Sequence, residues 1–149
     1  MDKFVSKSES ETKQLAISIV DSLTKGGSNN HACIVGLYGE LGSGKTTFTK
    51  YFAQSLGVID IVHSPTFVIM KSFDLENTNW KKLYHIDAYR IEDEKEMLNL
   101  GWEEIIGDRN NIVVLEWPER IARLMPAHNK IFFKHISEHE REIMIEMLK

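Results

Sequence analysis

The chain contains the stretch Gly39-Glu40-Leu41-Gly42-Ser43-Gly44-Lys45-Thr46, which has the G-x-x-x-x-G-K-T spacing of a phosphate-binding loop (P-loop). Glycines permit backbone conformations that a side chain would block, so successive N–H groups can turn inward around a phosphate chain. The motif predicts that Lys45 reaches the β- and γ-phosphates of a nucleotide and that the Thr46 hydroxyl binds Mg²⁺. This stretch therefore predicts a nucleotide-binding fold.

The sequence on both sides of the loop supports this interpretation. Residues 32–38 form a short apolar run that is typical of a buried parallel strand. After the loop, residues 47–56 place three apolar side chains at i, i+4 and i+8, namely Phe48, Phe52 and Leu56. This pattern predicts a helix, and its N-terminus would face the phosphates with the positive end of the helix dipole.

The length and composition favour a single P-loop domain over residues 1–149. A chain of 149 residues with 42% hydrophobic content can bury one core. The net charge of −4 provides no overall attraction for nucleic acid. The only cysteine, Cys33, lies in the predicted strand, which excludes a disulfide framework and favours a reducing compartment. No stretch has the roughly 18 apolar residues of a membrane span or the pattern of a signal peptide, so we expect a cytoplasmic protein without membrane contact.

The rest of the chain alternates between helical and strand patterns. Ser8 and Glu11 have the spacing of a capping box, and a helical apolar stripe follows as far as Gly26. Strands are predicted at residues 67–73, 83–87, 112–116, 131–133 and 141–147, and a helical stretch at residues 92–100. This alternation predicts a three-layer α/β P-loop NTPase domain with a central mixed, mostly parallel sheet.

Two carboxylates follow predicted strands and are candidates for the chemistry. Asp87 and Glu116 each end an apolar run, and the carboxyl ends of parallel strands gather at the ligand side of an α/β sheet. A P-loop enzyme needs such a carboxylate to orient Mg²⁺ or the attacking water. The alternative for each residue is a surface-facing strand end with no catalytic role.

Several other residues allow two interpretations. Thr66, within Ser64-Pro65-Thr66-Phe67, is either a sensor of the γ-phosphate or part of a proline turn. Trp117 either packs in the core or covers the phosphate site. His85 and Asp87 share a strand face, but two ligands make a weak metal site, so His85 is interpreted as structural. Arg90 either stabilises a transferred phosphoryl group or forms a surface salt bridge.

The nucleotide is assigned by elimination. A guanine-reading N-K-x-D element is absent, because the nearest string, Asn129-Lys130-Ile131-Phe132, lacks the aspartate. The sequence therefore favours ATP.

Four strings in register resemble the bacterial TsaE family (formerly YjeE), the ATPase subunit of tRNA threonylcarbamoyladenosine synthesis. They occupy residues 39–47, 64–67, 83–90 and 115–119. The resemblance implies an ATPase that works with two partner proteins, which modify the adenosine beside the anticodon in tRNAs that read codons beginning with A. Contact with tRNA is then expected to be indirect, through the partners.

The resemblance also implies roles for individual residues. Thr46 and Glu116 are expected to hold Mg²⁺, Asp87 to be needed for hydrolysis, and the segment with Thr66 to act as a switch. Together with Lys45, these give the predicted catalytic set Lys45, Thr66, Asp87 and Glu116. The predicted nucleotide-binding residues are Gly39, Glu40, Leu41, Gly42, Ser43, Gly44, Lys45, Thr46, Thr47 and Trp117. In addition, residues near the two termini are expected to contact the adenine, without an assignment of which ones.

The chain departs from the family pattern in two places, and two other functions stay open. Ala88 replaces a larger apolar residue, and residues 26–30 lengthen the link before the P-loop strand. One alternative is a small-molecule P-loop kinase, although no arginine-rich lid segment is visible. The other is a nucleotide-dependent assembly module with negligible hydrolysis. The favoured function is an ATPase with weak intrinsic turnover that partner proteins stimulate.

Overall fold

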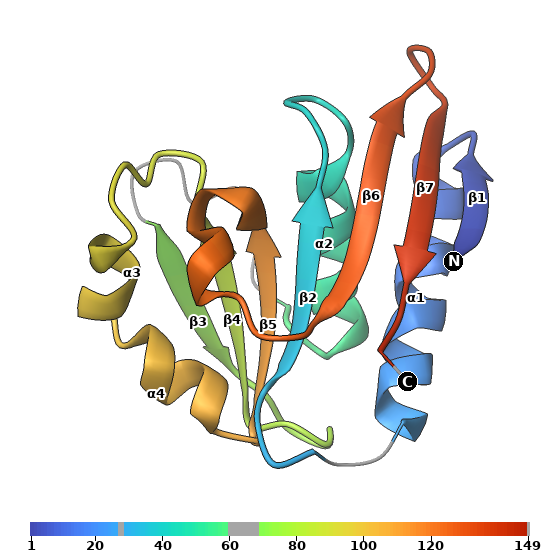
Figure 1. Ribbon diagram of the computed structural model, residues 1–149. Helices are drawn as coiled ribbons and strands as arrows, with labels where there is room; N and C mark the ends of the chain where they lie inside the picture. The colour runs from blue at the N-terminus through green and yellow to red at the C-terminus, as the bar shows by residue number, and fades with distance from the viewer. Residues whose placement is uncertain (27–28, 60–68, 149) are drawn as a thin grey trace.

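The structure is a computed structural model that describes residues 1–26, 29–59 and 69–148 (Figure 1). Along this part of the chain, helices and strands alternate as the sequence pattern predicts. The elements are β1 (Asp2–Ser6), α1 (Glu9–Lys25), β2 (Cys33–Tyr38), α2 (Lys45–Ser55), β3 (Met70–Asp74), β4 (Lys82–Asp87), α3 (Lys95–Asn99), α4 (Trp102–Gly107), β5 (Asn111–Glu116), the 3₁₀ helix η1 (Pro118–Leu124), β6 (Asn129–His135) and β7 (Arg141–Glu146).

The described strands form one mixed sheet in the order β1-β7-β6-β2-β5-β4-β3. The middle of the sheet is parallel, because β2 pairs in parallel with β5 and β6, and β5 with β4. The pairs β1–β7, β6–β7 and β3–β4 are antiparallel and lie toward the two sides. The predicted α/β class with a central mixed sheet is confirmed, and the parallel pairs lie in the middle of the sheet. All residues of β5 are buried, as expected for a central strand covered on both faces.

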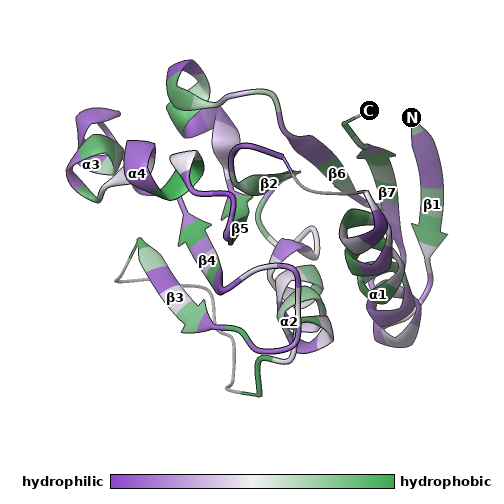
Figure 2. Ribbon diagram, turned by 90° about the horizontal axis from the view of Figure 1, so that it is seen from below, coloured by the Kyte–Doolittle hydropathy of each residue, from purple (hydrophilic) through white to green (hydrophobic). Residues whose placement is uncertain are grey.

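Helices cover the sheet on both faces and complete the predicted three layers. Helices α1 and α2 lie on one face, and α3, α4 and η1 lie on the other (Figures 1 and 2). The core under α1 and α2 includes Val35, Leu37, Phe48, Phe52 and Val114. The core on the opposite face includes Ile34, Ile86, Trp102, Leu115 and Ile121.

Helix α2 is fixed firmly against the sheet, which matters because it follows the P-loop. Phe48 and Phe52 are both 0% exposed, and burial of each ring contributes about 1.5–3 kcal/mol. The helix begins at Lys45, two residues earlier than the apolar pattern predicts, because Gly44 with φ 105° serves as its N-cap. The burial of this face holds the first turn of α2 at a fixed place beside β2.

Most predicted elements are present, with differences at their ends. Ser8 is the N-cap of α1 and accepts a hydrogen bond from the Glu11 backbone N–H at 3.1 Å, as the capping box predicts. The predicted helical stretch at residues 92–100 is shorter, and α3 spans Lys95–Asn99. The strand predicted at residues 67–73 begins at Met70, and residues 67 and 68 lie outside the described part of the chain. Three elements were not predicted at all: β1, α4 and η1.

Candidate nucleotide site

Residues 39–44 form the loop between β2 and α2 in the strand–loop–helix arrangement that the motif requires. Gly39, Gly42 and Gly44 all have positive φ angles, of 147°, 75° and 105°. At Gly39, an added Cβ would lie 2.6 Å from the Phe133 carbonyl oxygen and 2.8 Å from Ser43 Oγ. Only glycine fits this position, because any side chain would meet the backbone of the neighbouring strand β6.

Lys45, the first residue of α2, turns its side chain back toward the loop. Its amine donates a hydrogen bond to the Gly39 carbonyl and lies 3.6 Å from the centroid of the Trp117 ring. Lys45 is only 4% exposed, and this burial lowers its pKa against the raising effect of the carboxylates of Glu116, Glu119 and Asp87. The loop therefore holds a largely buried lysine amine between a carbonyl and an aromatic ring.

Glu116 and Thr46 meet at the same end of the sheet as the P-loop. In the parallel register of β2 and β5, Glu116 lies opposite Leu37, two residues before Gly39. The Thr46 hydroxyl donates to Glu116 Oε1 at 3.3 Å, and Glu116 is 3% exposed. Mg²⁺ prefers hard oxygen ligands and uses one or two protein groups beside substrate phosphates and water. The hydroxyl and carboxylate of this pair fit such a metal.

Asp87 reaches the same end of the sheet from the next strand. Strands β4 and β5 are parallel, and Asp87 lies directly opposite Glu116 in their register. The Tyr89 backbone N–H donates to Asp87 Oδ1 at 3.0 Å, which fixes one oxygen of this half-buried carboxylate. The structure thus brings Asp87 and Glu116 beside the P-loop. This is the position predicted for residues at the carboxyl ends of parallel strands.

His85 makes a contact that the sequence interpretation missed. Its Nε2 lies 2.8 Å from Glu116 Oε2, and the side chain is 0% exposed. The predicted structural role therefore describes its burial but not its partner. The available signal was the spacing of His85 and Asp87, which places both on the strand face that Glu116 shares.

Trp117 combines the two roles that the sequence left open. It is half-buried, its ring centroid lies 5.0 Å from that of Tyr89, and the Lys45 amine lies 3.6 Å from the centroid of the same Trp117 ring. Its backbone is left-handed, with φ 62°, and its N–H donates to the Leu37 carbonyl at 3.3 Å. This unusual backbone conformation directs the chain away from β5 into η1. Of the other candidates, Arg90 is exposed.

A small cavity of about 130 Å³ lies beside the first turn of α2. Three segments that are distant in sequence line it: the β1–α1 junction, the start of α2 and the β6–β7 hairpin. The lining residues include Ser8, Thr12, Gly44, Thr47, His139 and Arg141. Residues from the N-terminal and the C-terminal parts of the chain therefore line one cavity next to the P-loop.

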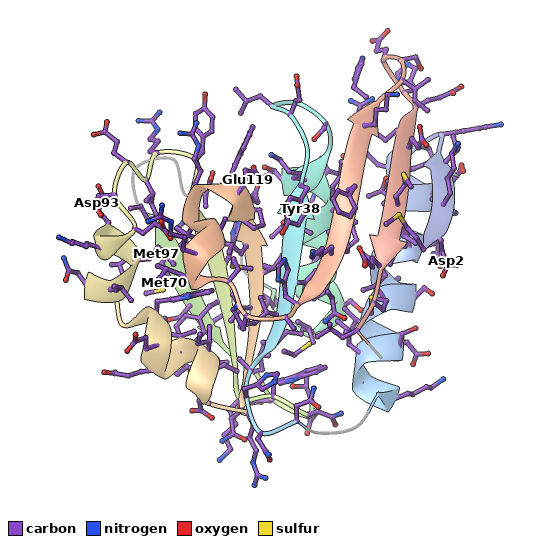
Figure 3. All side chains as sticks on the ribbon, viewed as in Figure 1. Asp2, Tyr38, Met70, Asp93, Met97 and Glu119 are labelled. Carbon is purple, nitrogen blue, oxygen red and sulfur yellow. The ribbon has the colours of Figure 1, made fainter. Side chains whose placement is uncertain are left out.

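The remaining candidates are either in the loop or outside the described residues. Glu40 and Leu41 form its exposed tip, whereas Ser43 is buried. Tyr38, just before the loop, and Glu119, in η1, also lie toward this end of the sheet (Figure 3). Thr66 falls within residues 60–68, so its predicted contact with phosphate or Mg²⁺ lies outside the described residues and stays a prediction.

Comparison with known proteins gives one consistent result. A protein-family model described as "Threonylcarbamoyl adenosine biosynthesis protein TsaE" matches residues 6–143. The tRNA threonylcarbamoyladenosine biosynthesis protein TsaE of Bacillus subtilis is 42% identical over 111 residues, which are 74% of this chain and 66%, just under two thirds, of that protein. The protein of the same name from Aquifex aeolicus is 36% identical over 147 residues, 97% of this chain and 96% of its own length.

The fold comparison agrees with the sequence comparison. A crystal structure of Bacillus subtilis YdiB superposes with a TM-score of 0.76 and 30% sequence identity. The match covers 99% of this chain and 86% of the YdiB chain. The overall fold of this chain therefore occurs in a solved relative.

Proposed function

The chain belongs to the TsaE family, whose members take part in tRNA threonylcarbamoyladenosine biosynthesis, and from this premise we propose that it is an Mg²⁺-dependent ATPase subunit of that process. The observation that carries the proposal is the convergence of Lys45, Thr46 and Glu116 at one end of the sheet. The Thr46–Glu116 pair supplies two oxygen ligands for the metal, directly beside the lysine that binds phosphate.

Each side chain of the site has a specific task in this proposal. Lys45 leaves the Gly39 carbonyl and binds the β- and γ-phosphates of ATP, while Thr46 and Glu116 hold Mg²⁺. Asp87, opposite Glu116, orients the attacking water. When bound, Mg²⁺ neutralises charge that develops on the phosphate oxygens. Trp117 covers the phosphate side of the site next to Lys45.

The backbone of residues 39–47 cradles the phosphates, and the nucleoside end of ATP extends into the cavity beside α2. That cavity is lined from both termini, by Ser8 and Thr12 on one side and by His139 and Arg141 on the other. These residues are our proposal for the adenine contacts that the sequence left unassigned. Thr66 is proposed as a switch that responds to the γ-phosphate.

The proposed partners are the two proteins that transfer the threonylcarbamoyl group to tRNA. The relatives from Bacillus subtilis and Aquifex aeolicus are named for tRNA threonylcarbamoyladenosine biosynthesis, which supports a role in the same process. A net charge of −4 favours contact with tRNA through these partners rather than directly. We propose that this chain is a single P-loop domain, residues 1–149, that works in the cytoplasm. Among the described helices, none is long and apolar enough to cross a membrane.

Turnover by this chain alone is expected to be slow. The Lys45 amine already has a hydrogen-bond acceptor in Gly39 and a cation–π partner in Trp117. ATP must compete with both contacts, and a partner that moves Trp117 would remove one of them. The occupied Lys45 amine supports the proposal that hydrolysis by the chain alone is weak and that partners stimulate it.

The test is to measure phosphate release from Mg²⁺-ATP with and without the two partner proteins. The proposal predicts weak release by the chain alone and strong stimulation in the complex. Phosphoryl transfer to a small metabolite would instead support the kinase alternative. Tight nucleotide binding without release, even with the partners present, would support the assembly module.

A further inference from the structure

His85 lies in the middle of β4 and binds Glu116 from the side opposite to Thr46. His85 Nε2 is 2.8 Å from Glu116 Oε2, whereas the Thr46 hydroxyl donates to Oε1 at 3.3 Å. The carboxylate is thus held at both oxygens by groups from two different elements, α2 and β4. These two contacts fix the plane of the carboxylate.

The neighbours of His85 along β4 and on β5 are apolar, whereas the exposed Lys71 lies opposite it on β3. A hydrophobic residue would therefore fit the buried part of this strand face. His85 lies opposite Val114 in the β4–β5 register, and Leu83, two residues earlier on the same face, is 0% exposed and belongs to the core under α1 and α2. A leucine or isoleucine would continue this core. The presence of a polar ring here needs a reason other than packing.

The hydrogen bonding of the ring gives that reason. A carboxylate only accepts hydrogen bonds, so Nε2 carries the proton in the bond to Glu116. The other nitrogen, Nδ1, is buried and has no hydrogen-bond partner within the part of the chain that the structure describes. Burial of an unpaired polar atom destabilises a fold. Among the described residues, the polar contact that compensates for this cost is the bond to Glu116.

We propose that His85 is a positioning residue that orients the Glu116 carboxylate for Mg²⁺. This inference rests on the proposed function, because it assigns Glu116 as a metal ligand. The bond at Oε2 prevents rotation of the carboxylate, so Oε1 stays directed toward Thr46 and the P-loop. Groups that orient a metal ligand in this way typically change metal affinity by about 10- to 100-fold when they are removed.

The experiment measures metal affinity rather than turnover. Mn²⁺ is titrated into the protein bound to AMP-PNP, an ATP analogue that is not hydrolysed at the β–γ bridge, and free Mn²⁺ is followed by EPR. His85→Leu removes the donor and is expected to weaken Mn²⁺ binding at least about 10-fold. The affinity for AMP-PNP in EDTA should stay unchanged, because Lys45 and the P-loop do not depend on His85.

Two amide variants distinguish an effect of the position of the hydrogen-bond donor from an effect on folding. His85→Gln places an amide N–H near the position of Nε2 and is expected to keep Mn²⁺ affinity within about 3-fold of wild type. His85→Asn places its amide at the level of Nδ1, too far from Glu116, and should weaken Mn²⁺ binding as the leucine does. This pair decides the question even if His85→Leu does not fold.

His128, a buried histidine that does not contact Glu116, provides a matched control. It is 7% exposed, and its ring nitrogens contact the Tyr38 hydroxyl and the Pro126 carbonyl, each at 2.7 Å. His128→Gln should leave Mn²⁺ affinity unchanged whatever it does to stability. Folded His85→Leu or His85→Asn protein with wild-type Mn²⁺ affinity would overturn the inference. If wild type itself shows no nucleotide-dependent Mn²⁺ binding, the proposed function fails instead.

Discussion

The two ends of the parallel strands bury polar side chains in different ways. At the amino ends, Asn111 Nδ2 donates to the Ile105 carbonyl at 2.9 Å. Asn129 Nδ2 donates to the Ile34 carbonyl at 3.1 Å, and its Oδ1 accepts from the Leu148 N–H at 2.9 Å. These side-chain amides bind backbone groups of neighbouring segments and so stabilise the ends of the strands.

At the carboxyl ends, buried polar groups contact one another instead of only the backbone. Glu116 contacts Thr46 and His85, and the Lys45 amine lies over Trp117. Ser43 Oγ and His85 Nδ1 are buried without a hydrogen-bond partner among the described residues. Satisfied amides stabilise a fold, whereas charged groups and unpaired polar atoms gathered at one place indicate a site for a ligand. We therefore assign stability to the amino end and chemistry to the carboxyl end.

The largest expected effect is that of Lys45→Ala on ATP turnover. Loss of the amine that is proposed to bind phosphate should reduce turnover by at least about 100-fold, because it removes charge stabilisation in the transition state. The protein should still fold, since alanine suits the first turn of a helix. Phosphate release and thermal denaturation measure the two properties separately. Normal turnover in this variant would contradict the P-loop assignment.

Glu116→Gln is expected to have the next largest effect. It preserves the size of the side chain but removes the charge that is proposed to hold Mg²⁺, so the Mg²⁺ concentration for half-maximal hydrolysis should rise about 10-fold or more. A titration of hydrolysis against Mg²⁺ measures this change. An unaltered Mg²⁺ dependence would point to Asp87 as the main carboxylate on the metal side.

Asn129→Leu tests the opposite end of the sheet. It leaves the Leu148 N–H and the Ile34 carbonyl without their side-chain partner, and should lower the free energy of unfolding by about 1–3 kcal/mol. ATP turnover at a temperature where the variant is folded should not change. Urea denaturation and phosphate release provide the comparison. Lower turnover at unchanged stability would contradict the assignment of stability to the amino ends and chemistry to the carboxyl ends.

The smallest effect concerns His128, the neighbour of Asn129. Burial lowers its pKa, and nearby Lys130 lowers it further, against the raising effects of the Pro126 carbonyl and of Glu146. As the pH falls below the ordinary value of about 6.5, the unfolded chain binds a proton that the folded chain does not, so stability decreases. In the His128→Gln variant, the free energy of unfolding should therefore fall less steeply with decreasing pH than in the wild type. Urea denaturation at several pH values between 5 and 8 checks it, and equal pH slopes in both proteins would refute it.

The sequence predicted the features that depend on local patterns. The P-loop motif and the apolar pattern after it predict a helix that follows the loop, although α2 begins at Lys45, two residues earlier than predicted. Asp87 and Glu116 were identified because parallel strands finish at a common end of the sheet, whatever their order. The capping box of α1 depends only on the spacing of Ser8 and Glu11.

The features that the sequence did not predict depend on pairing between distant segments. The bond from His85 to Glu116 requires the β4–β5 register, which no local pattern specifies. Strand β1 exists because it pairs with β7, and its short mixed sequence is not a strand signal alone. The cavity beside α2 is lined from the β1–α1 junction and the β6–β7 hairpin, so it exists only after the sheet is complete.

The most direct test of the division between the two ends is an NMR titration of the labelled protein with Mg²⁺ and AMP-PNP. Backbone amide shifts report where the nucleotide binds without relying on turnover or partners. We predict the largest changes at residues 39–47 and at Glu116 and Trp117, with little change at Asn111 and Asn129. Changes concentrated at the amino ends of the strands, with the P-loop amides unmoved, would contradict the account.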